Sequence, residues 1–305
     1  MLSISVRFLA LFAACEALAP GAGVFVLGPG AREVQLIAAK TAANAGYRSA
    51  CLCGKESPKQ RLNKVTGTRN IQRALMYGRA YAEEGADAEG RVRLVSTPDE
   101  IGDELAVCEG LIVCTEDAPM PRARLAGALN NAPKCAHVAL LSRMGAEGAL
   151  RAGEDDARAE CDARGIPFSV VRAGVLRGGG PGADVDGDGN APGALESVAL
   201  DRFYYDTLAK LEEYFATTSF DKILQGAAVC DGDAYAYPNA MQRAMRVDTF
   251  EPSDTDTPRT AVAGALVAAA GRTAGIELTV SSGKAKTPPS LDEWAAVLDE
   301  LSALA

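Results

Sequence analysis

Short apolar runs of strand length alternate along most of the chain with segments of helical periodicity. This alternation is typical of βαβ units and of a parallel sheet that is buried on both faces. The expected strands are 24–27, 48–53, 92–95, 111–114, 137–141 and 168–171. The pattern therefore predicts an α/β fold with a doubly wound parallel sheet of the Rossmann type.

Helices are expected between these strands, at 32–45, 69–84, 98–107, 122–129 and 154–164. Gly46 should end the first of them, and Thr97 should cap the helix that begins at Pro98. A Gly/Asp-rich stretch at 177–193 precedes a predicted helix near 202–216 and a strand–helix–strand–helix tail. We expect this tail to form a small lobe over the carboxyl ends of the strands, where such folds bind ligands.

The first 19 residues have the pattern of a signal or targeting segment. Arg7 supplies a positive charge, 8–14 is apolar, and small residues follow. A short buried helix is the alternative interpretation. Residues 20–305 contain no interdomain linker and are expected to form one domain. The apolar run at 8–14 is too short for a permanent membrane span, and no comparable run occurs later, so no stable span is expected in the mature chain.

Composition and charge exclude some function classes. With 48% hydrophobic and 23% charged residues, the chain has the composition of a globular protein. Its net charge of -9, with scattered basic residues, would repel nucleic-acid phosphates, so no nucleic-acid partner is expected. Four of the eight cysteines lie in apolar runs typical of buried free thiols, and no Asn-x-Ser/Thr acceptor occurs. These four are Cys51, Cys53, Cys114 and Cys230.

A signal-like start combined with reduced thiols resembles the bipartite plastid targeting of algae with secondary plastids. There the signal ends near an Ala-aromatic-Ala-Pro motif, and residues 17–20 read Ala-Leu-Ala-Pro. We therefore expect a plastid location. Secretion is the alternative.

A glycine turn follows the first predicted strand and opens the next helix. Such a turn lets backbone amides at a helix N-terminus approach the diphosphate of a dinucleotide with no side chain between them. Glu33 occupies the third glycine position of Gly-x-Gly-x-x-Gly, so the motif is incomplete. Arg32 is either a phosphate partner or a solvated surface side chain. The candidate phosphate-binding residues are Gly28, Pro29, Gly30, Ala31 and Arg32.

The end of the second predicted strand bears on the choice of cofactor. An acid at this place accepts the ribose hydroxyls of NAD, whereas a base meets the 2′-phosphate of NADP. This chain has Cys53, Gly54 and Lys55 here. Cys53 and Lys55 are therefore cofactor-binding candidates, and NADP is favoured over NAD, which remains possible.

Two further segments carry a family resemblance. Residues 137–145 end in Ser-Arg-Met-Gly after a strand, and 165–174 read Gly-Ile-Pro-Phe-Ser-Val-Val-Arg-Ala-Gly. Together with 24–28, the glycine turn and 110–115, they resemble the NmrA-like, NAD(P)-binding branch of the atypical short-chain dehydrogenase/reductase family. The resemblance implies that Gly28, Gly30 and Arg32 hold the phosphates. It implies a nicotinamide pocket lined by Thr115, Ser142, Ala173, Gly174 and Val175, and Cys114, which ends the strand before Thr115, is a further cofactor-binding candidate.

Hydride transfer in this superfamily uses a tyrosine acid, a lysine four residues later and a serine. Ser142 fits the serine, but 150–154 read Leu-Arg-Ala-Gly-Glu where Tyr-x-x-x-Lys is expected. No Tyr-x-x-x-Lys occurs in the chain. Tyr204 or Tyr205 could supply the acid, with Lys210 or Arg143 as the cationic neighbour. Alternatively, these tyrosines pack a helix against the sheet.

No metal site is predicted. The acidic run at 184–190 resembles the start of a calcium loop, but Leu195 stands at its twelfth position. Cys51 and Cys53 lack the second pair of a zinc site. His137, the only histidine, lies in a predicted strand and is expected to be structural.

Two functions remain open. The first is a NAD(P)-binding protein that holds NADP(H) without Tyr–Lys catalysis and serves another protein as an assembly or scaffold factor. The second is an NAD(P)H-dependent reductase of a small carbonyl or enone substrate with an unconventional proton donor. Because the catalytic motif is missing, we favour binding over catalysis.

Overall fold

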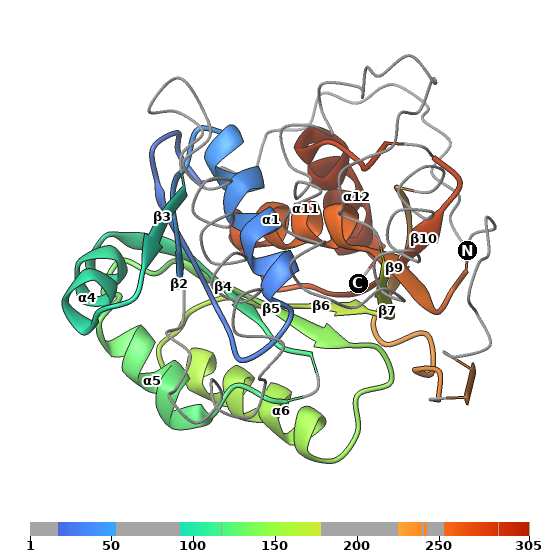
Figure 1. Cartoon of the computed structure of the whole chain (residues 1–305), viewed down its shortest axis with the longest axis horizontal. Helices are drawn as coiled ribbons and strands as arrows, with labels where there is room; N and C mark the ends of the chain where they lie inside the picture. Colours follow the sequence, from blue (N-terminus) through green and yellow to red (C-terminus); the bar gives the residue numbers. More distant parts are fainter. Residues whose placement is uncertain are drawn as a thin grey trace, which may run out of the picture.

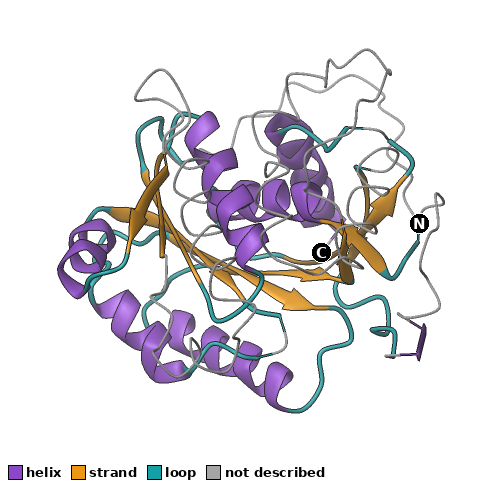
Figure 2. Ribbon diagram, in the orientation of Figure 1, coloured by secondary structure: helices purple, strands orange, loops and turns teal. Residues whose placement is uncertain are grey.

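The computed structural model describes residues 18–52, 92–116, 118–177, 225–239, 241–242, 253–285 and 287–304. They form three layers, with one large sheet between two layers of helices (Figures 1 and 2). One face of the sheet carries α1 (Arg32–Asn44), α11 (Arg259–Ala270) and α12 (Leu291–Leu304). The other face carries α4 (Pro98–Ala106), α5 (Arg122–Asn130) and α6 (Ala149–Asp162).

The large sheet has eight strands in the order β3-β2-β1-β4-β5-β6-β10-β8. Only the β10–β8 pair is antiparallel. The winding direction reverses between β1 and β4, so the predicted doubly wound fold of the Rossmann type is confirmed. The strands are β1 (Gly23–Leu27), β2 (Arg48–Leu52), β3 (Val92–Val95), β4 (Cys108–Cys114), β5 (His137–Arg143), β6 (Phe168–Ala173), β8 (Gly226–Asp231) and β10 (Glu277–Gly283).

Strand β1 shows why the apolar runs form central strands. Side chains alternate between the two faces of a strand. Val24 and Val26 belong to the core beneath α1 and α11, whereas Phe25 and Leu27 belong to the core beneath α4 and α5. Both faces are therefore apolar and buried, as expected for a parallel sheet between helix layers.

Helix α4 begins at the predicted cap. Thr97 accepts a hydrogen bond from the backbone N–H of Glu100, and the Glu100 carboxylate accepts from the backbone N–H of Thr97. Backbone hydrogen bonds from Ser96 and Thr97 lower the pKa of Glu100 to about 2. The prediction that Gly46 ends α1 is also confirmed, since the helix stops at Asn44 and Gly46 has φ +83°.

The predicted strand–helix–strand–helix tail is confirmed, but most of it joins the main sheet and one helix layer and does not form the expected lobe over the carboxyl ends of the strands. Strands β8 and β10 extend the large sheet, and α11 and α12 pack on the face of α1. A separate two-stranded sheet pairs β7 (Val175–Arg177) with β9 (Asp256–Pro258) beyond the carboxyl end of β6. In the described part of the chain, this small sheet is the lobe-like element.

The helix predicted at 154–164 begins earlier than expected, because α6 starts at Ala149 after Gly148, which has φ +56°. Residues 1–17 and the predicted helices at 69–84 and 202–216 lie outside the described residues. Within the described part, no helix is long and apolar enough to cross a membrane.

Candidate functional site

The glycine turn lies against the end of β4. A Cβ atom on Gly28 would stand 1.9 Å from the carbonyl oxygen of Cys114, and one on Gly30 would stand 2.9 Å from the Cβ of Glu116. The amide of Gly30 donates to the Cys114 carbonyl over 3.3 Å. Glycine is therefore required by the close approach of two backbones. The turn occupies the crevice between β1 and β4, where the winding reverses and where Rossmann folds place their ligands.

The turn leads directly into the N-terminus of α1. Ala31 is the N-cap, with φ +49°, and its side chain caps nothing. The first amides of a helix have no acceptor within the helix, and the helix dipole favours an anion there. Glu116 supplies one, because its Oε2 accepts from the amide of Ala31 over 3.3 Å. Pro29 is exposed. The side chain of Arg32 is outside what the structure describes.

Gln35 fixes the conformation of this turn. Its Nε2 donates to the carbonyl oxygens of Gly30 over 2.5 Å and of Gly28 over 3.4 Å. Gln35 lies on the first turn of α1 and is buried. Gln35 thus binds the two carbonyl groups of the turn, and the amide of Ala31 donates to the carboxylate of Glu116.

A cavity of about 230 Å³ adjoins Gly28 and Pro29 and lies between α4 and α5. Its lining is mostly apolar, with one polar side chain from α5, Arg124, and one from the C-cap of that helix, Asn131. The sequence analysis did not predict this lining, because apolar residues on helices that cover a sheet are expected to belong to the core. The lining includes Leu27, Ile101, Leu105, Met120, Arg124 and Asn131.

Cys114 and Thr115 lie beside the turn, at the end of β4. Burial raises the pKa of the Cys114 thiol. Thr115 is buried, and both its amide and its Oγ1 donate to the carbonyl of Leu141, over 3.1 and 2.6 Å. These two residues therefore join the ends of β4 and β5, and the Thr115 hydroxyl is engaged within the protein.

Ser142, at the end of β5, donates its hydroxyl to Oε1 of Glu154 on α6 over 2.5 Å. The other carboxylate oxygen of Glu154 accepts from Arg172 over 2.7 Å and from Arg151 over 2.9 Å. Ser142, Glu154 and Arg172 are all buried. Helix α6 has the sequence ALRAGEDDARAECD, which contains neither Tyr nor Lys. The Ser142 hydroxyl therefore donates to the Glu154 carboxylate. In a reductase, the same hydroxyl would donate to the substrate carbonyl.

Arg172 connects this cluster to the tail. Its guanidinium also pairs with Glu277 over 3.0 Å and lies 3.5 Å from Asp233. Burial lowers the pKa of Arg172, but pairing with Glu154 and Glu277 outweighs burial and leaves that pKa raised. The arginine is therefore a permanent cation among carboxylates.

The loop Ala173-Gly174-Val175 lies at the same carboxyl edge as the glycine turn. The amide of Met144 donates to the Ala173 carbonyl over 2.9 Å, and the amide of Gly174 donates to Oγ1 of Thr257 over 2.8 Å. The structure thus brings the ends of β1, β4, β5 and β6 to one edge. The candidates Cys53, Lys55, Tyr204 and Tyr205, together with Lys210 and the acidic run at 184–190, lie outside the described residues.

Tyr237 was not predicted and lies close to this edge. The guanidinium of Arg143 stacks over its ring, 4.5 Å from the centroid. Asp233 lies in the same segment, four residues before Tyr237, and its Oδ1 accepts from the amide of Gly145, just after β5, over 2.7 Å. Arg143, considered as the cationic neighbour of a tyrosine, thus has a tyrosine beside it. No spacing in the sequence links the two, because they meet only through the fold.

His137 lies at the opposite edge of the sheet, where the parallel strands begin, and has contacts typical of a structural residue. His137 contacts the Arg272 carbonyl through Nδ1 over 2.7 Å and Oγ of Ser169 through Nε2 over 2.8 Å. Burial lowers its pKa to about 4, so the imidazole is neutral. The predicted structural role of His137 is confirmed. In the described residues, no group of three or more His, Cys, Asp or Glu side chains is placed to hold a metal ion.

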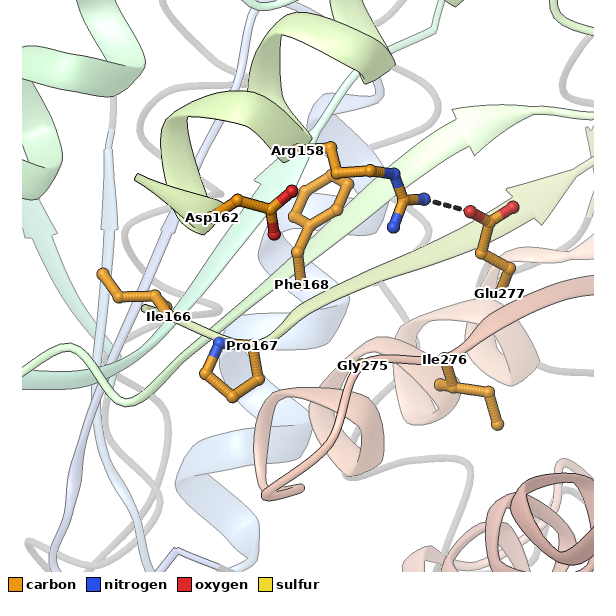
Figure 3. Close-up of a pocket in the computed structure, with 8 residues that line it drawn as sticks. All are labelled: Arg158, Asp162, Ile166, Pro167, Phe168, Gly275, Ile276 and Glu277. Atoms are coloured by element: carbon orange, nitrogen blue, oxygen red, sulfur yellow. Dashed lines mark hydrogen bonds and ion pairs between the residues drawn. The ribbon is translucent and has the colours of Figure 1, made fainter. Parts of the chain in front are cut away.

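A second cavity, of about 260 Å³, lies between α6 and the starting ends of β6 and β10 (Figure 3). The guanidinium of Arg158 lies 5.2 Å from the ring centroid of Phe168 and is ion-paired with Glu277. This cavity is at the amino edge of the sheet, away from the glycine turn. We assign it no part in the candidate site.

Known proteins resemble this chain only in fold. No family model matches the chain, and no curated protein is similar in sequence. A Rossmann-fold NAD(P)-binding family protein from Shigella flexneri is 9% identical, with 88% of this chain and 96% of that one covered and a TM-score of 0.40. UDP-N-acetylglucosamine 4-epimerase from Bacillus cereus is 8% identical, with 92% and 84% covered and a TM-score of 0.41. The terminal R domain of the myxalamid PKS-NRPS pathway is 10% identical, with 97% and 80% covered and a TM-score of 0.42.

These likenesses are too distant to add to what the strand order establishes. The Rossmann-type sheet rests on the strand order of this chain, and the resemblance to short-chain dehydrogenases/reductases stays a prediction. The narrower NmrA-like branch stays a prediction.

Proposed function

We propose that this chain binds NADP(H), or alternatively NAD(H), at the carboxyl edge of the sheet and does not carry out Tyr–Lys hydride transfer. One observation carries the proposal. The glycine turn between β1 and β4 already holds a carboxylate oxygen on the amide of Ala31. A backbone amide at a helix N-terminus that holds a carboxylate offers the same donor to a phosphate oxygen.

The proposal of binding without catalysis rests on the hydrogen bonds around Ser142. Glu154 accepts the Ser142 hydroxyl and is itself bound by Arg151 and Arg172. In a reductase, this serine would donate to the substrate carbonyl, and a tyrosine beside it would supply the proton. Here the Ser142 hydroxyl is bound by Glu154, and α6 contains no tyrosine. We therefore favour a role in which the bound nucleotide stabilises a protein that serves another protein as an assembly or scaffold factor.

Nucleotide binding is tested by titrating the full chain with NADPH and NADH while following intrinsic fluorescence and the thermal midpoint. A ligand present at 100 times its Kd should stabilise the fold by about 2.7 kcal/mol and raise the midpoint accordingly. Adenosine without phosphate is the control and should bind more weakly. Absence of any shift with both dinucleotides at millimolar concentration would contradict the proposal.

A reductase with an unconventional donor is the second candidate, and the stacked pair of Tyr237 and Arg143 favours it. A neighbouring cation favours the tyrosinate and so assists proton transfer. NADPH oxidation over a panel of small enones and carbonyls would reveal such an activity. Tyr237→Phe should then lower kcat by about 100-fold or more, while the Kd for NADPH stays unchanged. An equally active Tyr237→Phe variant would exclude this tyrosine as the donor.

We also propose a plastid destination for the mature protein. A fluorescent protein fused to residues 1–22, which end where β1 begins, should enter the plastid of an alga with secondary plastids. Accumulation in the medium would favour the secreted alternative.

A further inference from the structure

We infer that Glu116 lowers the affinity of the nucleotide site for phosphate-bearing ligands, because its carboxylate occupies a phosphate position and competes with the cofactor for it. This inference rests on the proposed function. It goes beyond it by naming a residue that lowers the affinity of the same site for phosphate-bearing ligands.

The position of Glu116 is fixed by its backbone. Its amide nitrogen would lie 3.0 Å from a Cβ atom on Gly30, so the chain after β4 runs directly against the glycine turn. The Oε2 atom accepts from the amide of Ala31 across a sequence separation of 85 residues. Two segments that are distant in sequence thus meet at the N-terminus of α1.

A carboxylate and a diphosphate compete for this place on two grounds. They use the same donor, the Ala31 amide, which can serve only one oxygen well. They also carry the same charge, and like charges brought together in a partly buried site repel one another. A dinucleotide must therefore displace the Glu116 side chain before its phosphates reach the turn.

Displacement requires no rearrangement of the fold. The side chain of Glu116 is exposed, and exposed side chains change rotamer within nanoseconds. The turn itself is held from beneath by Gln35, which donates to Gly30 and does not depend on Glu116. We therefore expect the phosphates to bind the same backbone once the Glu116 side chain has turned away from the amide of Ala31.

Glu116→Gln is the direct test, with Glu109→Gln as the matched control. The glutamine is isosteric, keeps an oxygen that can accept from Ala31, and removes the negative charge. Glu109 lies on the same strand, β4, near its amino end, about 20 Å from the turn. Both variants lose one negative charge from the chain, so a general charge effect would appear in both.

The affinities of wild type and both variants for NADPH, NADH and inorganic pyrophosphate are measured by isothermal titration calorimetry on the full chain. Glu116→Gln should bind each ligand about tenfold more tightly than wild type, whereas Glu109→Gln should match wild type. Thermal midpoints without ligand are recorded for all three proteins to confirm that each is folded.

The outcomes separate the two proposals. If wild type and Glu116→Gln bind NADPH with the same Kd, the competition is refuted and the nucleotide site stands. If Glu109→Gln gains as much as Glu116→Gln, the effect is one of net charge, and the inference is again overturned. If no folded variant binds any of the three ligands, the proposed function fails and the inference falls with it.

Discussion

At the scale of single residues, the most consequential feature is a buried arginine among carboxylates. Arg172 has a side-chain exposure of 1% and bonds Glu154, itself 4% exposed, over 2.7 Å. A buried pair of this kind adds little net stability, because desolvation offsets most of the attraction. Removing Arg172 costs more, since Glu154 stays buried and keeps only the half-exposed Arg151 as its cationic partner.

Arg172→Met should therefore lower the free energy of unfolding by about 3–5 kcal/mol, which urea denaturation would measure. The double variant Arg172→Met with Glu154→Gln should recover much of this loss, because it removes the stranded carboxylate. Ser142→Ala is the mild control and should cost only about 1 kcal/mol. A loss below that of Ser142→Ala would show that Arg172 is not the centre of this network.

His137 gives the protein a pH dependence of a defined sign. Burial holds its pKa at about 4, below the value of 6.5 for an accessible histidine. Above pH 6.5 the imidazole is neutral in both the folded and unfolded states, and its contribution to stability is fully present. As the pH falls from 6.5 towards 4, His137 is protonated in the unfolded chain but not in the folded chain, so stability is lost.

The expected loss from His137 across this range is at most about 3 kcal/mol. It is measured as urea midpoints at successive pH values for wild type and His137→Gln. Because His137 is the only histidine, the difference between the two curves isolates its titration from that of the carboxylates. Parallel curves between pH 7 and pH 4 would contradict the assignment.

At the scale of elements, α11 is a buried helix of small residues between the sheet and α12. All its residues except Ala268 are buried. Gly264 lies against the indole of Trp294 on α12, and a Cβ atom there would stand 2.8 Å from Nε1 and 3.0 Å from Cδ1. The glycine therefore sets how closely the two helices pack.

Gly264→Ala should destabilise the protein by about 1–3 kcal/mol through overpacking, although alanine is the better helix former. Trp294→Phe, which is smaller at the contact, should relieve the clash, so the double variant should be more stable than additivity predicts. Thermal or urea unfolding of the four proteins in this cycle gives the coupling. Strict additivity would mean that the contact at Gly264 does not limit the packing.

Strand centres could be predicted from the sequence, but not all their ends. The strand expected at 111–114 begins at Cys108, because Gly23 of β1 pairs with Cys108 and His137 of β5 pairs with Gly110. Glu109 and Gly110 interrupt the apolar run at this end of the strand. Such pairing is tertiary, and a local pattern does not contain it. The start of helix α4 was predicted well because its signals, Thr97 and Pro98, are local.

At the scale of the whole molecule, the same distinction applies to the candidate site. The glycine turn follows from residues adjacent in sequence and was predicted. The contact of Glu116 with Ala31 and that of Arg172 with Glu277 join residues 85 and 105 positions apart. Only the order of the strands brings them together, so the sequence showed the place of the site but neither its internal anion nor its buried cation.

The reactivity of the cysteines towards a thiol reagent reports whether the whole fold opens cooperatively. Cys51, Cys114 and Cys161 are buried in the two cores, whereas Cys230 on β8 is partly exposed. The thiolate is the reactive form, and burial raises the pKa of Cys161 to about 12. In the native protein, a maleimide should therefore modify Cys230 rapidly and these three cysteines only after the fold opens.

Peptide mass spectrometry over a labelling time course gives the opening rate at each of these positions. If the sheet unfolds as one unit, Cys51, Cys114 and Cys161 should be labelled at a common rate, and saturating NADPH should slow all three together, because it stabilises only the folded chain. Complete labelling in urea is the control for reactivity. Faster labelling of Cys114 alone would instead show that the junction of β4 with the glycine turn opens locally, and NADPH protection confined to Cys114 would then map the ligand to that junction.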